Sequence, residues 1–105
     1  MQVQINTDSN IEGNQVIAEQ VGYAIRDTLD RFSQHITRVE VHLSDENSDE
    51  KFGAHDKRCL IEARLANHQP ISVSDQAATV EQSLSGAAEK MKHLLDTTLG
   101  RLSDR

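Results

Sequence analysis

The sequence predicts a two-layer α/β sandwich of the α+β type, with the order βαβββα, a four-stranded sheet and two helices packed on one face. Apolar residues alternate with polar ones in four short segments, and they recur every three or four residues in two longer ones. The chain has 105 residues, which is the size of a single domain spanning 1–105. It contains two Phe, one Tyr and no Trp, so aliphatic side chains must form most of the core.

A strand and a long helix are predicted first. Residues 2–6 alternate, which places Val3 and Ile5 on one face of a strand. From Asn14, a suitable N-cap, the period changes to that of an amphipathic helix. Its apolar stripe consists of Ile17, Val21, Ile25, Leu29, Phe32 and Ile36. The spacing therefore predicts one helix that extends through Ile36.

Three more strands and a second helix follow. Residues 37–43 alternate cleanly, and so do residues 58–65, while the charged segment 44–57 has no period and is predicted to be a mobile loop. After a turn, a short strand covers residues 71–74. Thr79 begins a capping box, and the second helical stripe contains Val80, Leu84, Ala87, Ala88, Met91, Leu95, Leu99 and Leu102. The predicted core includes Val3, Ile25, Leu29, Val41, Ile61, Met91 and Leu95.

Net charge and cysteine content restrict the functional classes. Eleven Lys and Arg against seventeen Asp and Glu give a net charge of -6, so any nucleic acid must be met by a local basic patch. The single cysteine, Cys59, forms no internal disulfide, and the N-terminus lacks the pattern of a signal peptide. No apolar run approaches the roughly 18 residues that span a bilayer. We expect a cytoplasmic protein with no membrane partner.

Catalysis and metal binding are not expected. Cys59 is predicted to face the apolar layer, where burial raises a thiol pKa, and no nucleotide-binding or hydrolase fingerprint occurs. The acidic segment 45–56 differs from a calcium loop because Glu50 stands where that loop needs Gly. The five histidines have no zinc spacing. The sequence thus predicts no enzyme, no cofactor, no metal and no small-molecule substrate.

Four segments carry a family resemblance that covers nearly the whole chain: MQVQINT, RFSQHITRVEVHLSDEN, KRCLIEARLANHQPISV and AAEKMKHLLDTTLGRL. With the predicted order of elements, the chain resembles the ribosome hibernation-promoting factor and ribosome-associated inhibitor family, in its short, single-domain form similar to sigma-54 modulation proteins. The resemblance implies a stress-response protein that binds the small ribosomal subunit, through its RNA and proteins, and inhibits translation. Inhibition would be steric, by occupation of the channel that holds messenger and transfer RNA. Long members carry a second, dimerising domain that is not expected here.

Candidate RNA contacts fall in two groups of cations. One edge of the second helix carries Lys90, His93, Arg101 and Arg105, and the third strand with the loop before it carries Lys57, Arg58 and Arg64. The helix edge is equally consistent with a solvated border whose cations suit the C-terminal macrodipole. For the strand cations, cross-strand ion pairs to neighbouring carboxylates are the favoured interpretation.

Tyr23 is predicted to lie opposite the apolar stripe of the first helix, among charged residues. It could stack on a flipped base, or lie over its own helix with the hydroxyl in solvent. A second function class remains open as well. The net charge of -6 and the acidic residues 45–50 suit a protein-binding or regulatory relative that has lost RNA binding.

Overall fold

Four strands and two α-helices follow one another in the predicted order. The structure, a computed structural model, describes residues 1–8, 14–45 and 56–103, without the side chains of residues 14 and 101–103. The elements are β1 (Gln2–Thr7), α1 (Asn14–Leu29), a short 3-10 helix η1 (Asp30–Phe32), β2 (Ile36–Asp45), β3 (Lys57–Leu65), β4 (Ile71–Ala77) and α2 (Val80–Ser103). The predicted fold class is confirmed. Asn14 begins α1, but its capping role stays a prediction because its side chain is not described.

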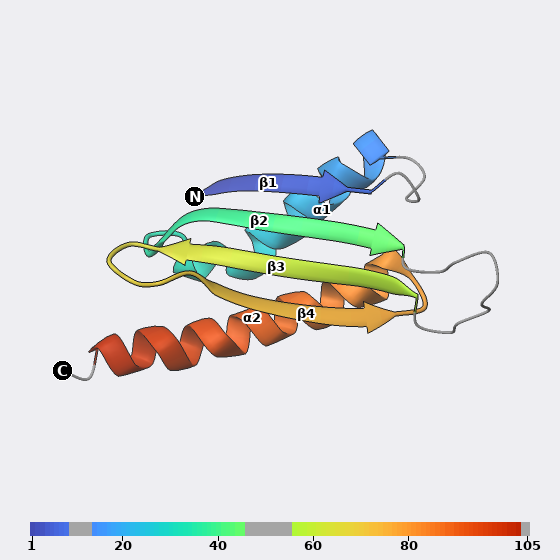
Figure 1. Ribbon diagram of the computed structural model, residues 1–105. Helices are drawn as coiled ribbons and strands as arrows, with labels where there is room; N and C mark the ends of the chain where they lie inside the picture. Colours follow the sequence, from blue (N-terminus) through green and yellow to red (C-terminus); the bar gives the residue numbers. More distant parts are fainter. Residues whose placement is uncertain (9–13, 46–55, 104–105) are drawn as a thin grey trace.

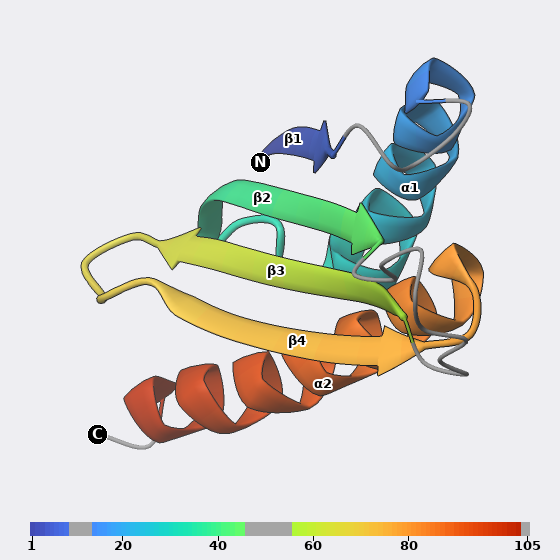
Figure 2. The ribbon, with the colours of Figure 1, turned by 45° about the vertical axis from the view of Figure 1, so that its right-hand side comes forward.

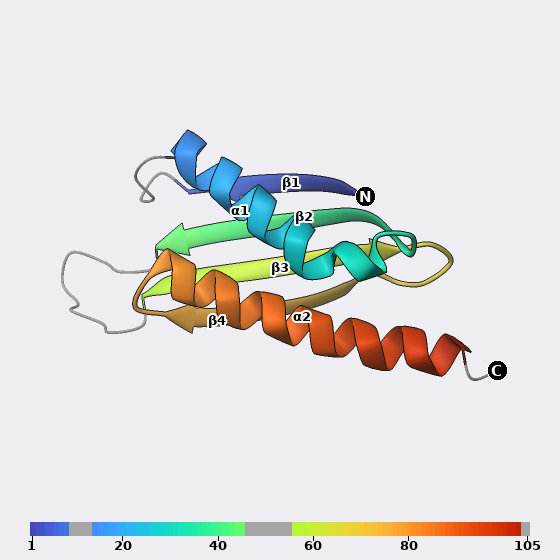
Figure 3. The same ribbon diagram turned by 180° about the vertical axis from the view of Figure 1, so that it is seen from behind.

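The sheet has the strand order β1-β2-β3-β4. β1 pairs with β2 in parallel, and the β2–β3 and β3–β4 pairs are antiparallel, as expected for one helical crossover followed by two hairpin-type connections. Both helices lie behind the sheet in Figure 1 and in front of it in Figure 3, so they cover the same face. The opposite face of the sheet carries no described helix.

The core lies between the helices and the sheet. Alternate residues of β2 and β3 project into it, and α1 and α2 cover them with their apolar stripes. The predicted core residues that are fully buried are Ile25, Leu29, Val41, Ile61, Met91 and Leu95. Val3 is only half-buried, although it packs against the same cluster. Its partial exposure follows from its place on β1, which is an edge strand.

The prediction of one helix through Ile36 is wrong. α1 ends at Leu29, η1 follows, and Ile36 is the first residue of β2. Two backbone hydrogen bonds tighten the chain there, from Ser33 N–H to the Asp30 carbonyl (3.0 Å) and from His35 N–H to the Phe32 carbonyl (2.9 Å). Phe32 and Ile36 remain buried, so their helical spacing in the sequence reflects burial rather than a continuing helix.

The strands are longer than predicted. β2 runs from Ile36 to Asp45 instead of 37–43, and β3 already begins at Lys57, so both ends of the predicted 44–57 loop belong to the sheet. The predicted mobility of this segment and its calcium-loop comparison fall on residues 46–55, which lie outside the described residues. β4 extends to Ala77 rather than Ser74.

α2 begins at the predicted cap. The Gln82 N–H donates to Thr79 Oγ1 (3.1 Å), which confirms Thr79 as the N-cap residue. The helix then continues past Gly100 to Ser103, so this glycine does not end it. α2 lies along β3 and β4 (Figure 1).

Candidate nucleic-acid interface

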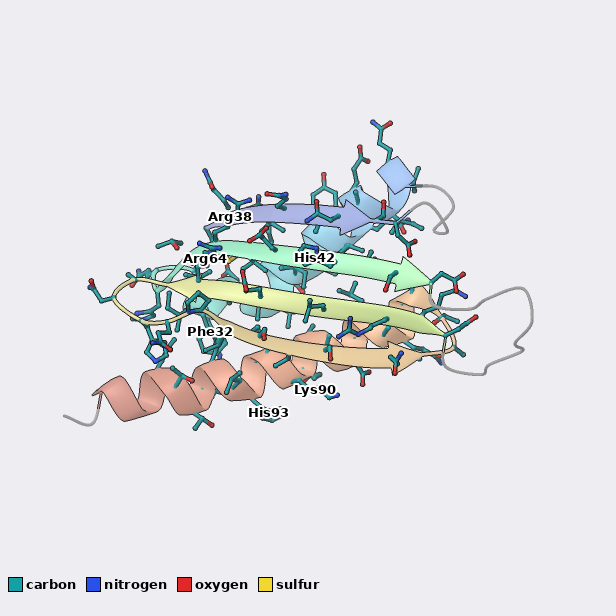
Figure 4. The ribbon with its side chains drawn as sticks, viewed as in Figure 1. Phe32, Arg38, His42, Arg64, Lys90 and His93 are labelled. Atoms are coloured by element: carbon teal, nitrogen blue, oxygen red, sulfur yellow. The ribbon has the colours of Figure 1, made fainter. Side chains whose placement is uncertain are left out.

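The exposed face of the sheet brings polar side chains from adjacent strands together. Figure 4 shows Arg38 and His42 on β2 and Arg64 on β3. In the β2–β3 register Arg38 lies opposite Arg64, and Glu40 lies opposite Glu62. Two arginines and two glutamates therefore occupy neighbouring positions on one polar surface.

Arg64 is held by ion pairs on this surface. Its Nε lies 3.6 Å from Glu62 Oε1 and 3.9 Å from Glu40 Oε2. Arg38 also approaches Glu40, at 3.6 Å, and donates a hydrogen bond to the side-chain carbonyl of Gln4. The structure thus shows the cross-strand ion pair of the alternative interpretation between Arg64 and Glu40, and a second ion pair to Glu62 within β3. The glutamates offset the charge that this end of the sheet could offer a phosphate.

The charge of Lys57, at the opposite end of β3, is likewise offset by carboxylates. Its Nζ lies 3.2 Å from Asp45 Oδ2 and 3.2 Å from Asp56 Oδ1. Hydrogen bonds to Asp56 and then Asp45 raise the pKa of Lys57 despite some opposing desolvation, so its charge is retained between two carboxylates. Lys57 therefore contributes little net positive charge to the surface.

Arg58 and Lys90 come together across β4. They line one shallow depression of about 550 Å³ together with Ser74, Asp75 and Gln76. Arg58 pairs in register with Gln76 and belongs to β3, whereas Lys90 comes from α2. One cation from each predicted group, Arg58 and Lys90, thus lines the same depression at β4.

Lys90 is anchored to β4 by two contacts. Its ammonium donates to the Ser74 carbonyl (2.9 Å) and to Asp75 Oδ1 (3.0 Å). An ammonium has three N–H donors, so one remains for another acceptor. Sequence reasoning missed Asp75 and Gln76, because β4 was predicted to end at Ser74. The one available signal was that Asp75 continues the alternation of Ile71 and Val73, but with a charged residue.

His93 extends the cationic edge along α2. Figure 4 shows Lys90 and His93 on the same side of this helix, beyond β4, and both are exposed. Arg101 belongs to the last turns of α2, but its side chain is not described, and Arg105 lies outside the described residues. Their predicted roles stay predictions.

Tyr23 lies at the other side of the molecule. Its side chain is 75% exposed, as the sequence predicts. It lines a groove between β1 and α1 with Val3 and Ile5, far along the sheet order from β4. The structure therefore does not place Tyr23 beside Arg58 and Lys90, and both interpretations of Tyr23, base stacking and lying over its own helix, stay open.

Other chemistry has little support in the described segments. Burial raises the pKa of the Cys59 thiol to about 12, with a smaller contribution from the charge of Asp75. In residues 1–8, 14–45 and 56–103 no three His, Cys, Asp or Glu side chains form a group that could hold a metal ion. None of the helices described there has the length and apolar character needed to cross a bilayer.

Several solved structures have a fold similar to that of this chain. The N-terminal domain of Protein Y from Thermus thermophilus superposes with a TM-score of 0.70 at 18% identity, over 93% of this chain and 99% of that one. A ribosomal subunit interface protein from Coxiella burnetii gives a TM-score of 0.63 at 9% identity, over 95% and 99%. Curated protein sequences contain no significant match.

The family comparison covers almost all of the chain. The family model described as "Sigma 54 modulation protein / S30EA ribosomal protein" matches residues 4–103. This range includes every strand and helix apart from the first two residues of β1. The chain therefore belongs to the sigma-54 modulation protein / S30EA ribosomal protein family, a family of ribosome-associated proteins.

Proposed function

We propose that this protein binds the small ribosomal subunit in the cytoplasm and inhibits translation without catalysis, by occupying the RNA-lined channel that messenger and transfer RNA use. Family membership supports association with the ribosome, and the description of the Coxiella relative as a subunit interface protein agrees with it. The observation that carries the proposal is the convergence of Arg58 and Lys90 on one depression at β4.

The depression offers hydrogen-bond donors for a phosphate group beside one carboxylate, Asp75, which forms an ion pair with Lys90. Arg58 presents a planar guanidinium with several donors, and Lys90 retains one N–H beyond its two contacts to β4. The side chains of Ser74 and Gln76 add neutral hydrogen-bonding groups on the same lining. Because β3 and α2 supply the two cations, their backbone positions are set before RNA binds, which lowers the entropic cost of binding.

His93 and Arg101 extend the same proposal along α2. Both lie C-terminal to Lys90 on the edge that the sequence predicts to be cationic, with Arg105 beyond. An RNA backbone that leaves the Arg58–Lys90 depression along α2 would meet them in turn. Arg64 and Lys57 have smaller parts in this interface, because each already lies between carboxylates.

Charge reversal of the two converging cations tests the proposal. We expect the double variant R58E/K90E to lose co-sedimentation with purified small subunits, because two phosphate contacts become repulsive. Lys92→Glu is the matched control for the helix, since position 92 lies about 200° around α2 from Lys90. This control should bind as the wild type does. Equal binding by R58E/K90E and wild type at low salt would refute the proposed site.

A protein-binding function is the second candidate. It is favoured by the ion pairs that hold Lys57, Arg64 and Lys90 to carboxylates, and by the net charge of -6. This function predicts ribosome binding, or binding to another protein, that changes little with salt and survives R58E/K90E. The RNA-binding proposal predicts the opposite in both respects.

A further inference from the structure

The two edge strands of the sheet differ in how they are protected. Pro70 precedes β4, the charged Asp75 sits on its helix-facing side, and Lys90 donates to the Ser74 carbonyl. Proline and inward charge are devices that discourage a further strand from adding to an edge. β1 has neither, since its sequence QVQINT contains no charged residue and no proline. Within the described residues, only β2 pairs with β1.

A groove with apolar walls runs beside this unprotected edge. It lies between β1 and α1, has a volume of about 340 Å³, and is lined by Val3, Ile5, Ala18, Glu19, Gly22, Tyr23 and Arg26. The N-terminal turns of α1 extend past β1 in Figures 1, 2 and 3. A strand added to β1 would therefore lie under this part of α1.

Exposed apolar side chains gather on the same side of α1. Val16 is 60% exposed and Tyr23 is 75% exposed, and no other large hydrophobic side chain in the described segments is as exposed. They are seven residues apart, which is about two helical turns and places them on one stripe. Within the described residues, a strand edge without charge or proline and an exposed apolar surface thus coincide, a combination typical of an interaction site.

We propose that a second copy of this chain occupies the edge, with the two β1 strands paired antiparallel about a two-fold axis. The two four-stranded sheets then form one continuous sheet. The overhanging turns of each α1 cover the half-buried Val3 and Ile5 of the other copy with Val16 and Tyr23. β-strand addition supplies main-chain hydrogen bonds, and the apolar contacts supply the burial.

Charge complementarity favours a second copy over an unrelated peptide. Arg26 lies at the start of β1, where it donates to the Met1 carbonyl (3.3 Å). Glu19 lies about two turns earlier on α1, toward the other end of β1, and has no ion-pair partner in the described part of the chain. A two-fold axis through the middle of β1 brings Glu19 of each copy to Arg26 of the other. The same attractive pair then forms twice.

A charge-swap experiment tests this dimer independently of ribosome binding. Sedimentation velocity over a protein concentration series should show self-association of the wild type. Either Glu19→Arg or Arg26→Glu should raise the dimer dissociation constant by about tenfold or more, because two attractive pairs become repulsive. An equimolar mixture of E19R and R26E should restore association as a heterodimer. Glu81→Arg on α2, an exposed acidic position away from β1, is the matched control and should dimerise as the wild type does.

Hydrogen exchange locates the contact. In the dimer, amides of β1 should gain protection as protein concentration rises, whereas those of β4 should not. A wild type that stays monomeric at every concentration would overturn the proposal. So would a dimer whose β1 amides remain unprotected, or one that forms equally well with E19R alone.

Discussion

The side chain of Asp75 in β4 packs closely against α2 at Gly86. A Cβ added at Gly86 would lie 1.8 Å from Asp75 Oδ2 and 2.7 Å from its Cγ, so α2 can approach this carboxylate only through a glycine. The carboxylate in turn holds Lys90 at 3.0 Å. Gly86 therefore allows the helix to lie close enough for Lys90 to reach β4.

Alanine substitution at two helical glycines separates this packing role from helix propensity. We expect Gly86→Ala to lower the free energy of unfolding by about 1 kcal/mol or more, because Asp75 must move away from its position beside Lys90. Gly22→Ala should raise it by about 1 kcal/mol, since nothing lies within 4 Å of the added Cβ. Denaturant unfolding of both variants measures the difference. Equal gains would contradict the close contact at Gly86.

Burial of the Cys59 thiol makes the free energy of unfolding depend on pH in the alkaline range. An ordinary thiol of the unfolded chain titrates near 9.0, whereas burial raises the pKa of the folded Cys59 thiol to about 12. Above the unfolded value the unfolded state binds fewer protons than the folded state, so stability falls with rising pH until the folded pKa is reached. The loss is about 1.4 kcal/mol per pH unit in this window.

Comparison with Cys59→Ala isolates this contribution from other alkaline titrations. Urea unfolding of both proteins at several pH values above about 9 should give a steeper loss of stability for the wild type. Parallel pH dependences would show that the thiol titrates as in the unfolded chain.

At the scale of single residues, side-chain types were predictable and partners were not. The sequence indicated that Arg58 and Lys90 are cationic and outward-facing. It gave no indication that they line one depression, because that depends on how α2 lies against β4. Asp75 was missed for a related reason: a charged residue on the helix-facing side interrupts the apolar alternation, and its contact with Lys90 becomes visible only when α2 is in place.

Alternation along β3 is the clearest case of an element that sequence determines. Cys59, Ile61, Ala63 and Leu65 are buried as predicted. Ile61→Asp should abolish the cooperative unfolding transition, because an unpaired carboxylate enters the core. Leu60→Asp, one residue earlier and on the exposed face of the sheet, should lower the free energy of unfolding by only about 1 kcal/mol. Thermal unfolding monitored by circular dichroism compares them, and a stable I61D protein would contradict the strand register.

Element boundaries were less predictable where one apolar spacing fits two structures. Leu29, Phe32 and Ile36 are all buried, and their intervals of three and four residues match a helix. The chain instead forms η1 and a turn between them, and the backbone hydrogen bond from His35 N–H to Phe32 closes it. Periodicity reports which side chains are buried, and it cannot distinguish a continued helix from a tight turn that buries the same residues.

For the whole molecule, the proposed RNA binding would depend on local charge rather than on net charge. The protein carries -6 overall, and the ion pairs of Lys57 and Arg64 reduce its positive surface further. Arg58, Lys90 and His93 are gathered at the β4 side, whereas the proposed self-association edge is at β1. The two proposals thus place RNA and a second copy at opposite edges of one sheet. The fold class was predictable because the apolar residues of each segment recur with the period of a strand or of a helix. The placement of the two proposed surfaces at opposite edges was not predictable, because it depends on the order of the strands in the sheet.

Co-sedimentation with purified small subunits over a salt series tests the central proposal most directly. Binding through about three phosphate contacts should weaken as salt rises, with log K falling by about two to three units per tenfold increase in salt. R58E/K90E should bind weakly at every salt concentration. No binding of the wild type even at low salt, or binding independent of both salt and the double substitution, would contradict an RNA interface at β4.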